Sequence, residues 1–86
     1  MDIKQLEIFV TACERGSFSK AADCMYMTQP IVRNSIRGLA HESGRPLLPR
    51  NAKGLQPTDY GMPALDRAQM TINSAATIAS LLDPAE

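Results

Sequence analysis

Five residues between positions 28 and 42 have side chains suited to recognising nucleic acid bases. If this stretch is helical, a rotation of about 100° per residue places them on one face, and that face carries no acidic residue. They are Gln29, Pro30, Arg33, Asn34 and Arg37. An Arg guanidinium can bond to both O6 and N7 of guanine, and a Gln or Asn amide to N6 and N7 of adenine. The face therefore has the chemistry to read base edges in a DNA major groove.

The distribution of charge supports a phosphate-facing surface in the same region. The formal net charge of the 86 residues is zero. However, residues 1–58 hold eight basic and five acidic side chains, a net charge of +3, whereas residues 59–86 have a net charge of −3. Between Thr28 and Lys53 there are five basic residues and a single acid, Glu42. We expect Lys20, Arg50 and Lys53 to contact the DNA backbone, since a local cationic excess attracts phosphates.

Nothing in the sequence indicates catalysis. His41 is the one histidine, and a surface or capping role is expected for it near the end of a helix. Ser17 and Ser19 have no partnering His and Asp at meaningful positions. There is no glycine-rich phosphate loop and no cluster of metal ligands. Cys13 and Cys24 form no C-x-x-C pair and are expected to be small buried thiols of a cytoplasmic protein. We therefore expect no enzyme, metal site or cofactor.

Two helices are predicted before the basic stretch. The first covers residues 3–15, because Asp2 and Gln5 have the spacing of a capping box and Gly16 can end the helix in a left-handed conformation. The second is short and covers residues 18–25, after the N-cap Ser17.

The third helix is predicted over residues 28–42, with Thr28 as N-cap and a proline in the first turn. Its inward face is apolar and consists of Val32, Ile36 and Leu39. After it, residues 47–50 and 55–58 flank a turn-like segment and predict a short two-stranded ribbon. Each proposed strand contains a proline, so both must be short and edge-like.

The last helix is predicted over residues 59–82, and residues 83–86 are expected to fray. Gly61-Met62-Pro63 predicts a kink or a late helix start. Two positions that repeat every seven residues form an apolar seam. The seam consists of Leu65, Ala68, Ile72, Ala75, Ala79 and Leu82. It can pack on its own domain or on a second copy; we favour a dimer, since a domain of this plan offers little core for so long a helix.

This order of elements is mainly α-helical and corresponds to a winged helix-turn-helix: three helices, a two-stranded wing and a long C-terminal dimerisation helix. The residues themselves resemble the N-terminal DNA-binding domain of LysR-type transcriptional regulators, over residues 1 to about 80. The resemblance is carried by Leu6-x-x-Phe9, Gly16-Ser17-Phe18-Ser19-x-Ala21-Ala22, Thr28-Gln29-Pro30, Ile36-x-x-Leu39, Gly44-x-x-Leu47, Arg50 and Thr58-x-x-Gly61. Regulators of this family normally continue into an effector-binding domain.

The resemblance implies two parts and a tail: a DNA-binding domain over residues 1–58, a linker helix over 59–82 that pairs two domains, and the tail 83–86. The face of the helix 28–42, from Thr28 onward, would lie in the major groove. The wing, residues 47–58 with Arg50 and Lys53, would lie near phosphates or the minor groove. The expected function is sequence-preferring binding of duplex DNA by a homodimer, in the cytoplasm and associated with the nucleoid.

One departure from the family pattern leaves a second hypothesis open. After Gln29-Pro30 the family usually has Ser-Arg-Gln directly before the Ile, whereas this sequence has Arg33-Asn34-Ser35 before Ile36. The arginine is displaced by one residue, which turns it by about 100° around the helix, and Gly38 lowers the propensity of the same helix. A short protein that binds DNA weakly and forms mixed dimers with related full-length regulators through its last helix is therefore the alternative. No membrane association is expected.

Overall fold

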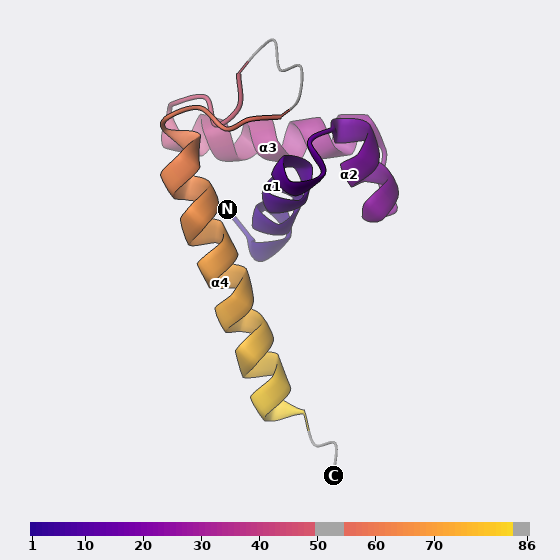
Figure 1. Ribbon diagram of the computed structural model, residues 1–86, viewed down its shortest axis with the longest axis vertical. Helices are drawn as coiled ribbons and strands as arrows, with labels where there is room; N and C mark the ends of the chain where they lie inside the picture. Colours follow the sequence, from indigo (N-terminus) through magenta and orange to yellow (C-terminus); the bar gives the residue numbers. More distant parts are fainter. Residues whose placement is uncertain (50–54, 84–86) are drawn as a thin grey trace.

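The structure is a computed structural model that describes residues 1–49 and 55–83. These residues contain four helices: α1 (Ile3–Arg15), α2 (Phe18–Cys24), α3 (Gln29–Ser43) and α4 (Gly61–Leu82). Figure 1 shows α1 crossing beneath α3, with α2 at one end of α3 and α4 leaving from the region of the other end. α1 packs against all three other helices, and α2 packs against α3. The helical fold predicted from the sequence is confirmed, with helix limits that differ by one or two residues.

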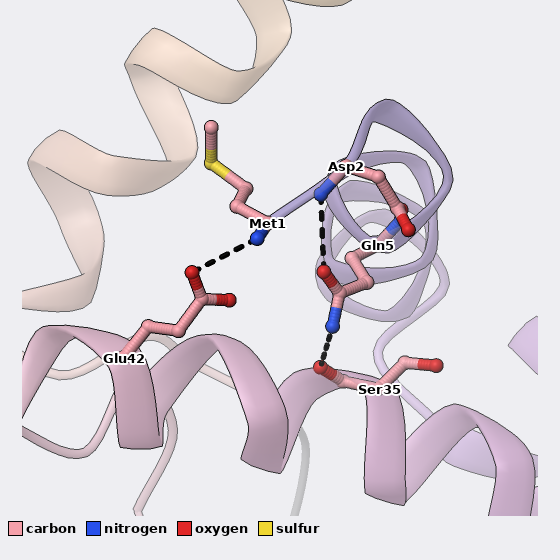
Figure 2. Close-up of polar contacts among 5 residues, drawn as sticks. All are labelled: Met1, Asp2, Gln5, Ser35 and Glu42. Carbon is pink, nitrogen blue, oxygen red and sulfur yellow. Dashed lines mark hydrogen bonds and ion pairs between the residues drawn. The ribbon is translucent and has the colours of Figure 1, made fainter.

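The capping box of α1 forms as predicted and also connects α1 to α3. The Asp2 carboxylate accepts a hydrogen bond from the backbone N–H of Gln5 (2.8 Å), and the Gln5 side-chain oxygen accepts one from the backbone N–H of Asp2 (3.1 Å; Figure 2). The Gln5 amide nitrogen lies 3.5 Å from the carbonyl oxygen of Ser35 and donates to it. A good N-cap contributes about 1 kcal/mol to a helix, so this end of α1 is fixed by local contacts.

The other predicted caps are also confirmed. The Ser17 and Thr28 hydroxyls accept backbone N–H groups at the starts of α2 and α3. Gly16 and Gly44 adopt φ angles of 72° and 76° at the ends of α1 and α3, a region that glycine enters without a Cβ clash. These caps determine where the chain turns between α1, α2 and α3.

The core lies where α1 meets its three neighbours. Phe9 and Val32 are the largest fully buried side chains. Ala21 and Ala22 are buried between α2 and the rest of the core, where their small side chains let the helices approach closely. The expectation of two buried thiols is only half correct. Cys13 is half-buried, and burial raises its pKa to about 11, but Cys24 is exposed because the end of α2 lies outside the core.

The segment between α3 and α4 differs from the predicted ribbon. Neither residues 47–49 nor residues 55–58 form a strand, and the rest of the ribbon, with Arg50 and Lys53, lies outside the described residues. Proline lacks an N–H group, so Pro49 and Pro57 cannot donate to a strand ladder. Residues 47–49 and 55–58, the two arms of this segment, are instead joined where the backbone N–H of Thr58 donates to the Leu47 carbonyl oxygen at 3.1 Å.

Thr58 and Gly61 attach this segment to the start of α4. The Thr58 hydroxyl donates to the Pro46 carbonyl oxygen (2.8 Å) and accepts the Gly61 N–H (3.0 Å). A Cβ atom at Gly61 would collide with the Leu47 carbonyl oxygen, so the close approach requires glycine at this position. α4 begins at Gly61 rather than Asp59, which puts Pro63 in the first turn, where a missing N–H costs nothing. The predicted late start is therefore confirmed.

The 22 residues of α4 extend about 33 Å, and the molecule measures 49 × 25 × 18 Å because the end of this helix projects from the body (Figure 1). Ala68 is only 3% exposed, and Leu65 and Ile72 are partly buried against the core. The expectation that α4 would find little core to lie against is thus wrong for its first half. No helix in the described part of the chain is long and apolar enough to cross a membrane.

Candidate nucleic-acid interface

α3 presents an exposed polar face because its apolar face is anchored in the core. Val32, Ile36 and Leu39 are all buried, and they hold the helix against α1 and α2. The five recognition residues predicted from the sequence are all exposed on α3, as is the N-cap Thr28. Sequence periodicity therefore assigned both faces of this helix correctly, although α3 begins and ends one residue later than predicted.

A stripe of basic side chains follows one edge of the α3 face. Arg33, Arg37 and His41 are spaced by four residues, so they lie in a row along the helix, and all three are exposed. Beside this row is an open hollow of about 810 Å³ between α3 and the segment that follows it. The hollow is lined by Phe18, Arg33, Ile36, Arg37, Ala40, His41, Gly44, Arg45, Pro46, Leu47, Leu48 and Pro49. None of these described lining residues is acidic.

Two arginines of the hollow stack on aromatic rings. The Arg33 guanidinium carbon lies 4.9 Å from the centroid of the Phe18 ring. The Arg45 guanidinium carbon lies 5.4 Å from the centroid of the Tyr60 ring. A cation over an aromatic face is attracted by the ring quadrupole, by about 0.5–1 kcal/mol at exposed sites. The two stacks therefore restrict these guanidinium groups.

The single acid of the basic stretch is neutralised by the chain terminus. The Glu42 carboxylate lies 2.9 Å from the N-terminal amine of Met1 (Figure 2). This ion pair joins the start of the chain to the last turn of α3. Both groups are about half exposed, so solvent screens the pair, but it removes an uncompensated negative charge from α3.

Of the three cations predicted to contact the DNA backbone, the structure describes one. Lys20 is exposed on α2, whereas Arg50 and Lys53 lie outside the described residues. Arg45 belongs to the basic stretch but follows the end of the helix at Gly44, so the helical pattern does not predict it as a site residue. Only the tertiary contact with Tyr60, fifteen residues later, reveals it as part of the surface. The sequence indicates this residue only through the excess of basic residues between Thr28 and Lys53.

The predicted dimerisation seam divides into two parts in the folded chain. Leu65, Ala68 and Ile72 pack against their own core. Ala79 and Leu82 are exposed on the projecting end of α4, together with the apolar neighbours Ile78 and Leu81. Ala75, partly buried, lies between the two parts.

A second open hollow, of about 480 Å³, lies between α1 and α4. Its lining includes Glu7 and Glu14 on α1 and the amides of Gln69 and Asn73 on α4, so it lacks the basic character of the α3 surface. In residues 1–49 and 55–83, no group of three or more His, Cys, Asp or Glu side chains could hold a metal ion.

Comparison with known proteins agrees with this geometry. The family model described as "Bacterial regulatory helix-turn-helix protein, lysR family" matches residues 3–62. The chain is 39% identical over 79 residues to the HTH-type transcriptional regulator AbaB of Streptomyces antibioticus, which is 92% of this chain and 26% of AbaB. It is 33% identical over 85 residues to the HTH-type transcriptional regulator GalR of Pseudomonas putida, which is 99% of this chain and 21% of GalR. The chain thus spans about a quarter of the length of these relatives.

Two solved structures superpose closely. The protein in the BenM_DBD/catB site 1 DNA complex matches with a TM-score of 0.90 and 30% identity, covering 94% of this chain and 91% of that chain. The protein in the CbnR_DBD–DNA complex matches with a TM-score of 0.85 and 26% identity, covering 93% and 92%. Together with the family match over residues 3–62, these likenesses establish that the chain belongs to the lysR family of bacterial regulatory helix-turn-helix proteins.

Proposed function

We propose that this chain binds duplex DNA with sequence preference, as a dimer, and forms the DNA-binding part of a transcriptional regulator. The observation that carries the proposal is the exposed, acid-free face of α3, held outward by the buried side chains of Val32, Ile36 and Leu39. The likeness to BenM_DBD and CbnR_DBD, both solved with DNA, supports it. The proposed role is one of binding, without catalysis.

In this proposal the first two turns of α3 enter the major groove. Gln29 and Asn34 read base edges, since their amides both donate and accept hydrogen bonds. Arg33 and Arg37 bind bases or phosphates. Thr28 and Pro30, at the N-terminus of the helix, approach the DNA closely, where the positive end of the helix dipole favours phosphate.

Further cations position the protein on the DNA backbone. Lys20 on α2 is one of them, and it is exposed. We assign residues 47–58 to a wing that approaches phosphates or the minor groove through Arg50 and Lys53. The closure of this segment by Thr58 and Leu47 supports that role, because it ties both arms to the end of α3 and the start of α4.

The projecting half of α4 is the proposed dimer contact. Ala79 and Leu82 of the predicted seam are exposed there, with Ile78 and Leu81 beside them, and such an apolar surface is stabilised by a second helix. Leu65, Ala68, Ile72 and Ala75 would support the seam from within each copy. Two α3 helices held in this way would enter major grooves one turn or more of DNA apart. A protein bound to chromosomal DNA would act in the cytoplasm, at the nucleoid.

Pairing with a related full-length regulator, with weak DNA binding, is the less favoured function. The exposed end of α4 would serve mixed dimers as well as homodimers. The anchored polar face of α3 and the basic hollow beside it, however, are features that a pure pairing module does not need.

Selection of bound DNA from a pool of random duplexes, at about 50 and 200 mM salt, tests the proposal, because release of counterions makes phosphate binding salt-dependent. We expect a two-fold-related motif for the wild type and loss of that motif for Arg33→Ala/Arg37→Ala. Arg67→Ala, a matched exposed arginine on α4, serves as the control and should retain the motif. If nothing is enriched and wild type equals the double variant, α3 does not read DNA, and mixed-dimer formation becomes the better function.

A further inference from the structure

We propose that the hollow beside α3 holds the phosphate backbone of one DNA strand, with Arg45 as a phosphate ligand and Tyr60 as the residue that positions Arg45. The inference rests on the proposed function and deepens it, since Arg45 adds a backbone contact to those of Arg33 and Arg37 on α3 and of the wing cations Arg50 and Lys53. It also predicts which aromatic ring keeps that contact in place.

The lining of the hollow has the chemistry of a phosphate site. Arg33, Arg37 and Arg45 supply guanidinium N–H donors, and His41 supplies an imidazole. Among the described residues that line it there is no carboxylate, amide or hydroxyl side chain. A phosphate presents only hydrogen-bond acceptors, and an arginine side chain presents only donors. A wall made of donors and apolar groups therefore matches phosphate oxygens.

One contact restrains the Arg45 side chain, and two hydrogen bonds fix the backbone around it. Its guanidinium stacks on the Tyr60 ring. Its carbonyl oxygen accepts a hydrogen bond from the Ser43 hydroxyl at 3.2 Å. The next carbonyl, that of Pro46, accepts the Thr58 hydroxyl at 2.8 Å. An ordered side chain loses less rotamer entropy when it binds, so Arg45 is prepared for a contact that a free surface arginine would make only weakly.

The dimensions fit several phosphates. The basic row from Arg33 to His41 covers about 12 Å of helix, and one DNA strand carries a phosphate for about every 3.4 Å of helix axis. About three phosphates can therefore lie along the hollow. Arg33, on its Phe18 ring, would be at one end of this row, and Arg45, after the turn at Gly44, also lines the hollow.

The test is the salt dependence of binding to two duplexes, one selected as above and one of scrambled sequence. Each phosphate contact contributes about 0.9 to the slope of log K against log salt. We expect Arg45→Gln to reduce that slope by about one and to weaken binding about five-fold at 100 mM salt, equally for both duplexes. Tyr60→Leu should give a partial loss, and Tyr60→Phe, which keeps the ring, should behave as wild type.

Arg67→Gln is the matched control, because Arg67 is exposed on α4 and does not line the hollow; its slope should equal that of wild type. Thermal unfolding followed by circular dichroism establishes that each variant is folded. If folded Arg45→Gln keeps the wild-type slope, the inference is overturned while the proposed function stands. If wild type itself binds neither duplex, the proposed function fails and the inference with it. Loss confined to the selected duplex would also overturn it, since that pattern indicates base reading.

Discussion

The two halves of α4 carry the same apolar repeat but lie in opposite surroundings. In the first half, Ala68 is 3% exposed and packs with Leu65 and Ile72 against the core beside α1. In the second half, Ile78 is 57% exposed and Leu82 76%. A heptad repeat thus identifies the side of a helix that needs an apolar partner. Which partner covers it depends on how much of α4 lies beside α1, and this is decided by the tertiary structure.

The largest expected effect is on the hydrophobic core against which the first half of α4 packs. Phe9 is 1% exposed, and Phe9→Ala leaves a cavity at the contact of α1 with its neighbours. We expect the free energy of unfolding to fall by about 3–5 kcal/mol, measured by denaturant titration. A loss below about 1 kcal/mol would mean that α1 is not the centre of the core.

The next largest effect concerns the junction that sets the direction of α4. Gly61→Ala places a Cβ against the Leu47 carbonyl oxygen, which is backbone and cannot move aside freely, so we expect a loss of about 1–3 kcal/mol. Gly38→Ala is the control, because its Cβ would meet the Gln5 amide, the end of a flexible side chain, at 3.2 Å. In thermal unfolding, Gly38→Ala should be neutral or stabilising; an equal loss in both variants would contradict the proposed backbone clash.

Substitution of one isoleucine in each half of α4 tests the difference between the halves directly. Ile72→Ala should lower the unfolding free energy of the dilute protein by about 1–2 kcal/mol, because Ile72 is partly buried against the core. Ile78→Ala should change it by less than about 0.5 kcal/mol. Sedimentation measures self-association, and there Ile78→Ala should weaken the dimer more than Ile72→Ala does. If neither variant alters self-association, the exposed half is not the dimer contact.

The smallest effect is at the turn between α2 and α3. Tyr26 has a φ of 56°, which is unfavourable for a residue with a Cβ, and its side chain is 97% exposed, so almost no packing offsets this strain. Tyr26→Asn should stabilise the fold by about 0.5 kcal/mol, since Asn enters the left-handed region more readily. A lower melting temperature for this variant would show that the tyrosine ring contributes to the fold.

Local signals in the sequence were sufficient for much of the fold and for the face of α3. Asp2, Ser17 and Thr28 were predicted as caps, and each accepts a backbone N–H three residues later. The wing was less predictable. Its prolines cannot donate to a ladder, and the contacts that join residues 47–49 to residues 55–58 involve Thr58 and Leu47, eleven residues apart.

The sequence by itself determined the helices, their caps, the buried and exposed sides of α3 and the family resemblance. These depend on groups within three or four residues of one another, and such groups meet whatever the rest of the chain does. Only the tertiary structure decided that Ala68 belongs to its own core, that Gly61 lies against Leu47 and that Arg45 stacks on Tyr60. Each of these contacts joins distant parts of the chain, and its formation depends on how the helices pack around α1.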